Sequence, residues 1–135
     1  NQPSGITTDG TNLYVADSDN RLIRKIVIST GVVTTVAGTG SSGSANGTGT
    51  SASFNYPYGI TTNGTNLYVT ETSNHLIRKI VISTGVVTTV AGTGSSGSAN
   101  GTGTSASFNQ PSGITTDGTN LYVADLGNHL IRQIE

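Results

Sequence analysis

The sequence predicts an all-β protein built from repeated sheets, and three observations support this prediction. First, only 10% of the 135 residues are charged and 5% are aromatic, whereas threonine, serine, glycine and asparagine are abundant. Second, short runs of valine, isoleucine and leucine alternate with turn signals that contain glycine or asparagine. Third, the chain repeats itself. Because β-branched residues favour strands while glycine and asparagine favour turns, the composition and the pattern agree.

The repeat has a period of 54 residues. The segment NQPSGITTDGTNLYV starts at Asn1 and returns at Asn109, and its variant NYPYGITTNGTNLYV starts at Asn55. From Leu22 to Asn55 the sequence recurs without change from Leu76 to Asn109. The predicted units are residues 1–54, residues 55–108 and a partial third unit, residues 109–135.

Each full unit contains four predicted strands. In the first unit, Asp9 and Gly10 end the first strand and form a hairpin turn to the second. The Ser-Thr-Gly sequence at residues 29–31 forms the turn between the third strand and the fourth. A connection of about twenty residues then leads to Gly59, and connections of that length are usually functional or mobile. The predicted strands of this unit are residues 5–8, 12–17, 22–28 and 32–37.

Repeated units of four short antiparallel strands are typical of β-propeller blades. One four-stranded sheet cannot bury both of its faces, whereas sheets stacked around a common axis cover each other. This need explains why the unit is repeated. A solenoid of stacked sheets is the alternative architecture, and the sequence favours the propeller over it.

The units resemble the NHL repeat in three segments: PSGITTDGTNLYVADSDNRLIRKI, PYGITTNGTNLYVTETSNHLIRKI and PSGITTDGTNLYVADLGNHLIRQI. The Asn-His-Leu that gives the repeat its name stands at residues 74–76 and 128–130, whereas residues 20–22 read Asn-Arg-Leu. The long connection is similar to the one between blades of some bacterial NHL proteins. The resemblance implies a β-propeller, most often six-bladed, that is used chiefly for binding.

Two full units and three strands of a third make almost three blades, which cannot close a ring. An open propeller leaves two blade faces and their apolar side chains in water, and such surfaces associate. We therefore expect self-assembly, with two chains completing a six-bladed ring with two-fold symmetry. The third blade is expected to lack its outer strand. The alternative is that the chain is a piece of a longer propeller.

The first two units differ at only eight positions, all between residues 2 and 21. Structural need would keep the strands constant, but it would not keep a long surface connection constant, because loops tolerate change. The identity therefore indicates copying, either a recent duplication or deliberate construction.

Most of the variation falls on one rim of the predicted disc. In an up-and-down sheet, the turn between the second and third strands lies at the same end as the connection between units. A constant scaffold with a varied rim is typical of a binding protein, although drift at exposed sites explains the pattern equally well. Tyr56 and Tyr58 are the strongest candidates, because tyrosine is favoured in contact surfaces and Pro57 stiffens the segment between them. The candidate binding residues are Gln2, Ser4, Ser18, Asp19, Arg21, Tyr56, Tyr58, Thr72, Ser73, His75, Gln110, Ser112, Leu126 and His129.

The sequence offers little for catalysis. It contains no cysteine, and its two histidines occupy equivalent positions one period apart. We expect His75 and His129 to pair with Glu71 and Asp125 and to fix a turn, as Arg21 would with its neighbouring acid, rather than to act in acid–base chemistry. The glycine-rich segment GTGSSG lacks the lysine and the following helix of a phosphate-binding loop. No catalytic residue, metal site or cofactor is predicted; an axial calcium or sodium ion would have no dedicated loop.

The predicted function is a non-catalytic scaffold or binding module that assembles with copies of itself. The alternative is the ligand-binding part of a larger bacterial surface or secreted protein, with a peptide or carbohydrate as ligand; a hydrolase or lyase is disfavoured because the converging histidines and carboxylates of such propellers are missing. The net charge of -1 and the absence of a basic run argue against nucleic acid. No segment is apolar enough for membrane insertion. The composition favours an extracellular or cell-surface location in a bacterium.

Overall fold

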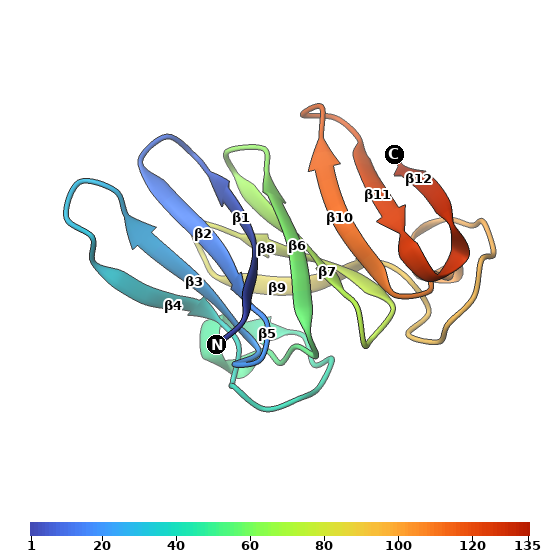
Figure 1. Ribbon diagram of the computed structural model, residues 1–135, viewed down its shortest axis with the longest axis horizontal. Coiled ribbons are helices and arrows are strands. Elements are labelled where there is room, and N and C mark those ends of the chain that lie inside the picture. Colours follow the sequence, from blue (N-terminus) through green and yellow to red (C-terminus); the bar gives the residue numbers. More distant parts are fainter.

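The computed structural model describes residues 1–135 and consists of three antiparallel sheets placed side by side (Figure 1). The first sheet has four strands, the second has five, and the third has three. Each sheet begins with the Pro-x-Gly-Ile-Thr-Thr segment of its unit. The strands are β1 (Pro3–Thr8), β2 (Asn12–Asp17), β3 (Leu22–Val27), β4 (Val33–Ala37), β5 (Gly47–Thr48), β6 (Pro57–Thr62), β7 (Asn66–Glu71), β8 (Leu76–Val81), β9 (Val86–Ala91), β10 (Pro111–Thr116), β11 (Leu121–Asp125) and β12 (Leu130–Ile134).

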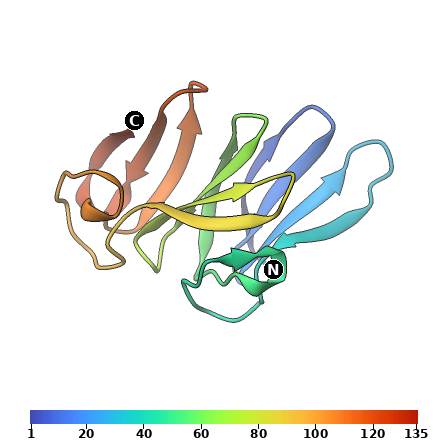
Figure 2. The same ribbon diagram turned by 180° about the vertical axis from the view of Figure 1, so that it is seen from behind.

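The sheets are stacked as propeller blades. Within each blade the strands lie side by side in chain order, and β5 adds to the outer edge of the second sheet, beside β9. The inner strands, β1, β6 and β10, lie next to one another along the inner side of the stack (Figure 1). The third blade consists of the three strands β10, β11 and β12. Figure 2 shows the stack from behind, with the blades spread like a fan. This arrangement confirms the all-β class and favours the propeller over the solenoid.

Apolar side chains fill the two spaces between the blades. Because successive side chains of a strand point to opposite faces, the second blade contributes one set to the first space and another to the second space, whereas the first and third blades contribute one set each. Tyr14 and Ala16 of β2 pack in the first space against Leu67 and Val69 of β7. The second space is filled in the same way, with Ile77 of β8 among its members.

The connection between the first and second blades is an ordered part of the packing. Its residues Gly47 and Thr48 form β5, which pairs with the outer strand β9 of the second blade. A 3₁₀ turn, η1 (Gly49–Ser51), follows, and Ala52 and Phe54 are buried in the space between the blades. This stretch is therefore more than the long loop that the sequence predicts, because it contains a strand and buried side chains. The corresponding turn before the third blade is η2 (Gly103–Ser105), and a third, η3 (Leu126–Asn128), follows β11. None of the helical turns has the length and apolarity that crossing a membrane requires.

Candidate binding rim and open blade faces

The structure brings the candidate rim residues of successive blades into contact. The Tyr56 hydroxyl donates a hydrogen bond to Gln2 Oε1 at 3.1 Å, which links the starts of the first two blades. The backbone N–H of Gln110 donates to His75 Nδ1 at 3.0 Å, which links the second blade to the third. The rim is therefore one continuous strip of side chains along one end of the stack.

Six rim residues have a left-handed backbone although none of them is glycine. They occupy two positions of the repeat, the residue before the proline and the residue before the leucine of the third strand. Non-glycine residues rarely adopt this conformation, and they keep it only where the surrounding structure fixes the backbone. The backbone is thus constant while the side chain changes between units. The six residues, with φ between 47° and 57°, are Gln2, Arg21, Tyr56, His75, Gln110 and His129.

Several rim hydroxyls join blades to each other. Ser18 is buried, and its hydroxyl donates to the Pro57 carbonyl at 2.6 Å. Thr72 makes the equivalent bond to the Pro111 carbonyl at 3.0 Å. The third unit has Leu126 at this position, and its side chain is exposed. The hydroxyl at this position thus bonds to the next blade in the first two units, and the third unit has an apolar side chain in its place.

The remaining rim candidates divide by exposure. Ser4 and Ser112 bond to neighbouring backbone carbonyls, Tyr58 O and Ala124 O respectively. Asp19 is partly buried. The side chains most open to a ligand are those of Gln2, Tyr58, Ser73, Gln110, Leu126 and His129. No three histidine, cysteine, aspartate or glutamate side chains gather as metal ligands would.

The acidic residue at the end of each second strand pairs with an arginine of the third strand. The distances are 3.3 Å for Arg24 Nη1 to Asp17 Oδ2, and 2.7 Å for Arg78 Nη1 to Glu71 Oε1. The third blade repeats the pair at 3.0 Å. The prediction that these acids pair with the histidines and with Arg21 was therefore wrong. The pairing follows from the antiparallel register, which places the arginine two residues beyond the partner of the acid.

The ion pair of the second blade, between Arg78 and Glu71, is the most buried of the three. Arg78 donates to the Ser53 and Ala45 carbonyls and to Asn46 Oδ1, and its guanidinium lies 5.3 Å from the centre of the Phe54 ring. All four partners belong to the connection that precedes the blade. Burial raises the pKa of Glu71 to about 7, while Arg78 and the side chain of Asn74 oppose this shift. The connection thus holds a charged group between two blades.

The hairpin turn at the opposite rim is fixed by a carboxylate or an amide. Asp9 Oδ1 accepts from the backbone N–H groups of Thr11 and Asn12, and the Asn12 bond is the largest cause that lowers the pKa of Asp9 to about 2. In the second unit Asn63 Oδ1 accepts the same two bonds. Either side chain supports the turn, so the exchange at this position is explained by turn structure.

The two outer faces of the stack consist of residues that are buried elsewhere in the same chain. Ile60 is 6% exposed between the first two blades, whereas its equivalent Ile6 is 60% exposed on the free face of the first blade. Ile77 is fully buried between the second and third blades, whereas Ile131 is 77% exposed on the free face of the third. Val33 of the first blade is exposed in the same way, whereas its equivalent Val87 is buried. Each free face is therefore one half of an interblade interface.

These repeated blades define a β-propeller protein, and comparison with known proteins gives its family. The NHL repeat family matches residues 108–134. Protein SUPPRESSOR OF QUENCHING 1, chloroplastic, of Arabidopsis thaliana is 35% identical over 146 residues. NHL repeat-containing protein 2 of Homo sapiens is 32% identical over 150 residues. Both alignments cover 99% of this chain, which spans 14% and 21% of those proteins. These matches support the assignment of the chain to the NHL repeat family.

Solved structures share the arrangement of blades. An auxiliary nutrient binding protein from Bacteroides thetaiotaomicron superposes with a TM-score of 0.82 and 26% identity, over 96% of this chain and 36% of that one. A virginiamycin B lyase from Staphylococcus aureus superposes with a TM-score of 0.59 and 21% identity, over 97% of this chain and 40% of that one. At that identity the lyase shows the fold alone.

Proposed function

We propose that the chain is a non-catalytic NHL scaffold that binds copies of itself through its two open blade faces. Two chains of three blades then form one six-bladed ring. The observation that carries this proposal is the exposure of Ile6 and Ile131, whose equivalents are buried in the interblade spaces. The non-catalytic role is supported by the acids, which are paired with arginines, and by His75, whose Nδ1 is occupied by a backbone N–H.

The two free faces are complementary because the repeat makes them so. The free face of the third blade corresponds to the face of the second blade that packs on the third. The free face of the first blade corresponds to the face of the second blade that packs on the first. A second copy can therefore join head to tail, in the geometry already present inside the chain, and such an interface closes into a ring where the rotation allows it.

An acidic substitution at Ile131 tests this proposal. We expect Ile131→Asp to abolish the dimer, because a carboxylate would be buried unpaired at the junction. The folded single chain should be unaffected, since this side chain is 77% exposed. The measurement is the mass by light scattering behind a sizing column, with folding checked by circular dichroism.

Thr119→Asp is the matched control, because it adds the same charge at an exposed hairpin turn away from both faces. It should leave the mass of the assembly unchanged. Equal masses for the native chain and Ile131→Asp would refute association through this face.

A second candidate function is ligand binding at the rim. It is favoured by exposed Tyr58 and by the fixed left-handed positions that present different side chains in successive blades. The structural relative that is named as a nutrient binding protein is consistent with this role. A peptide and carbohydrate array would identify such a ligand, and it would separate this function from a purely structural one.

A further inference from the structure

The sequence Asn-Gly-Thr occurs three times in the chain, at residues 46–48, 63–65 and 100–102. An asparagine followed by glycine loses its side-chain amide without an enzyme when the backbone nitrogen of the glycine attacks the Cγ atom of the asparagine. Glycine makes this attack easiest, because it has no Cβ atom to crowd the ring that forms. Since the three sites have the same sequence, differences in their reactivity come from the fold.

The site at Asn63 is open to solvent and its amide carbonyl is polarised. Asn63 and Gly64 are exposed in the hairpin turn between β6 and β7, and a Cβ atom at Gly64 would meet nothing within 4 Å. Asn63 Oδ1 accepts from the backbone N–H groups of Thr65 and Asn66, at 3.1 Å and 2.8 Å. Two such donors stabilise the negative charge that forms on this oxygen during attack at Cγ, as in an oxyanion hole.

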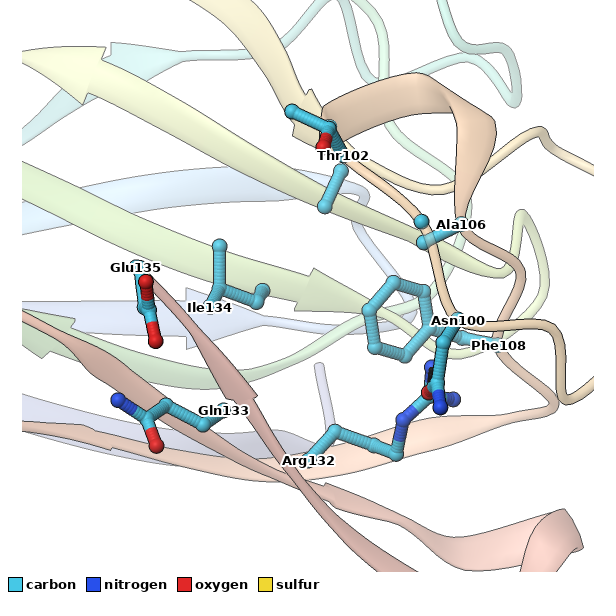
Figure 3. Close-up of a pocket in the computed structure, with 11 residues that line it drawn as sticks. Asn100, Thr102, Ala106, Phe108, Arg132, Gln133, Ile134 and Glu135 are labelled. Carbon is cyan, nitrogen blue, oxygen red and sulfur yellow. Dashed lines mark hydrogen bonds between the residues drawn. The ribbon is translucent and has the colours of Figure 1, made fainter.

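A polarised carbonyl is common to all three sites. Asn46 Oδ1 accepts from Arg78 Nη2 at 2.9 Å. Asn100 Oδ1 accepts from Arg132 Nη2 at 2.9 Å, and Figure 3 shows these two side chains directed at each other. The state of the carbonyl therefore does not distinguish the sites.

The attacking nitrogen is held differently at Asn63 and at Asn46. The Gly64 N–H donates to Thr62 Oγ1 at 3.0 Å, and this contact is exposed, so water competes with it. Gly47 pairs with Val87 in the ladder between β5 and β9. Attack at Asn46 therefore requires a strand to leave its ladder, whereas attack at Asn63 requires only the loss of a surface hydrogen bond.

We propose that Asn63 is a site of spontaneous deamidation, which gives the second blade the aspartate that the first and third blades have in the same turn. The Gly64 nitrogen loses its proton and forms a bond to Asn63 Cγ. The bond from Cγ to Nδ2 breaks, so ammonia leaves and a cyclic succinimide remains. Water then opens the ring: addition at Cγ gives aspartate, and addition at the backbone carbonyl carbon gives isoaspartate. The site does not depend on the proposed ring, because it lies at the rim opposite the candidate binding rim.

The neighbouring blades show that the turn accepts the aspartate product. In the first blade Asp9 accepts the same two backbone hydrogen bonds, and its second oxygen accepts from the Tyr14 hydroxyl at 3.0 Å. The third blade repeats all three bonds. In the second blade the Tyr68 hydroxyl accepts from Asn66 Nδ2 at 3.5 Å, and it can donate its own proton to the new carboxylate.

The test incubates the full chain at mildly alkaline pH and follows each asparagine by peptide mass spectrometry with fragmentation. In the folded chain we expect Asn63 to convert roughly tenfold or more faster than Asn46, because the paired backbone at Gly47 must first be released. In concentrated urea the two rates should become similar, since both asparagines precede Gly-Thr. One of the two products should co-elute with the variant Asn63→Asp.

Thr62→Val removes the hydroxyl that restrains the Gly64 N–H, and it should speed conversion of Asn63 by roughly 2- to 10-fold. Thr8→Val is the matched control, because it makes the same change in the first blade and should leave the rate at Asn63 unaltered. Equal rates at Asn63 and Asn46 in the folded chain would overturn the proposal. So would an Asn63 that stays intact in the folded chain while it converts in urea. A rate that Thr62→Val leaves unchanged would overturn the role given to the Gly64 nitrogen.

Discussion

Replacing Arg78 with alanine is expected to lower the free energy of unfolding by about 3–5 kcal/mol. The substitution leaves the Glu71 carboxylate in a fully buried place without its charged partner. It also leaves the Ser53 carbonyl without a donor, takes away one of the two donors to the Ala45 carbonyl, and removes the cation that lies over the Phe54 ring. Urea unfolding followed by circular dichroism measures the change, at a concentration at which all variants have the same mass.

The repeat supplies the control at Arg24. This arginine holds the same position in the first blade, but its side chain is 31% exposed and donates to Asp17 alone. Exposed ion pairs contribute about 0–1 kcal/mol, so Arg24→Ala should cost no more than that. If both substitutions cost the same, the enclosure by the preceding connection would not be what stabilises the buried arginine.

The second large effect is expected at Gly59 of the inner strand β6. A Cβ atom there would lie 2.2 Å from the Ser112 carbonyl oxygen of the next blade and 3.0 Å from Thr70 Oγ1. Both neighbours are held in place, because that carbonyl accepts from the Thr70 hydroxyl at 2.6 Å. Gly59→Ala should therefore force the inner strands apart and cost about 3 kcal/mol, at the upper end of overpacking effects. Thermal and urea unfolding measure this cost.

Gly113 is the matched position in the third blade. A Cβ atom there meets only the Ala124 Cβ, at the ordinary distance of 3.7 Å, because no blade follows. Gly113→Ala should change the stability of the single chain by no more than about 0.5 kcal/mol. Equal costs at Gly59 and Gly113 would show that the approach of the next blade does not set the requirement for glycine.

Much of the fold could be predicted from the sequence because the same pattern of strands and turns recurs in every unit. The strands were predicted from the alternation in NLYV, the Asp-Gly turns and the constant period. The predicted bounds differ from the observed ones by two residues for β1 and by one residue each for β3 and β4. The three strands of the third blade were expected from the same pattern.

The packing between blades could not be predicted in the same way, because it joins residues far apart in the chain. The connection was read as a loop since its glycines and serines carry no strand pattern, yet Gly47 and Thr48 pair with a strand of the next unit. The acid–arginine pairs were not predicted, because the histidines and Arg21, which are nearer in the sequence, were expected to be the partners of the acids. A signal was present, since an acid is followed seven residues later by arginine in all three units, as in Glu71 and Arg78.

The candidate rim residues lie along one end of the stack, but the contacts that they make were not visible in the sequence. The hydroxyls of Ser18 and Thr72 donate hydrogen bonds to the next blade, and only the stacked structure reveals these contacts. The left-handed backbone of Tyr56 and His75 is likewise a property of the folded connection.

The central claim is that the open blade faces join in the geometry of the inner interfaces, and Gly113→Ala tests it most directly. In the chain, Gly5 lies against the Tyr58 carbonyl and Gly59 against the Ser112 carbonyl, so Gly113 would lie against the Ser4 carbonyl of a second copy. We would measure the masses of the native chain and of Gly113→Ala by light scattering across a concentration series. We expect a mass of twice 13.7 kDa for the native chain and of 13.7 kDa for the variant. A native chain that remains at 13.7 kDa at every concentration, or a variant that assembles as the native chain does, would contradict it.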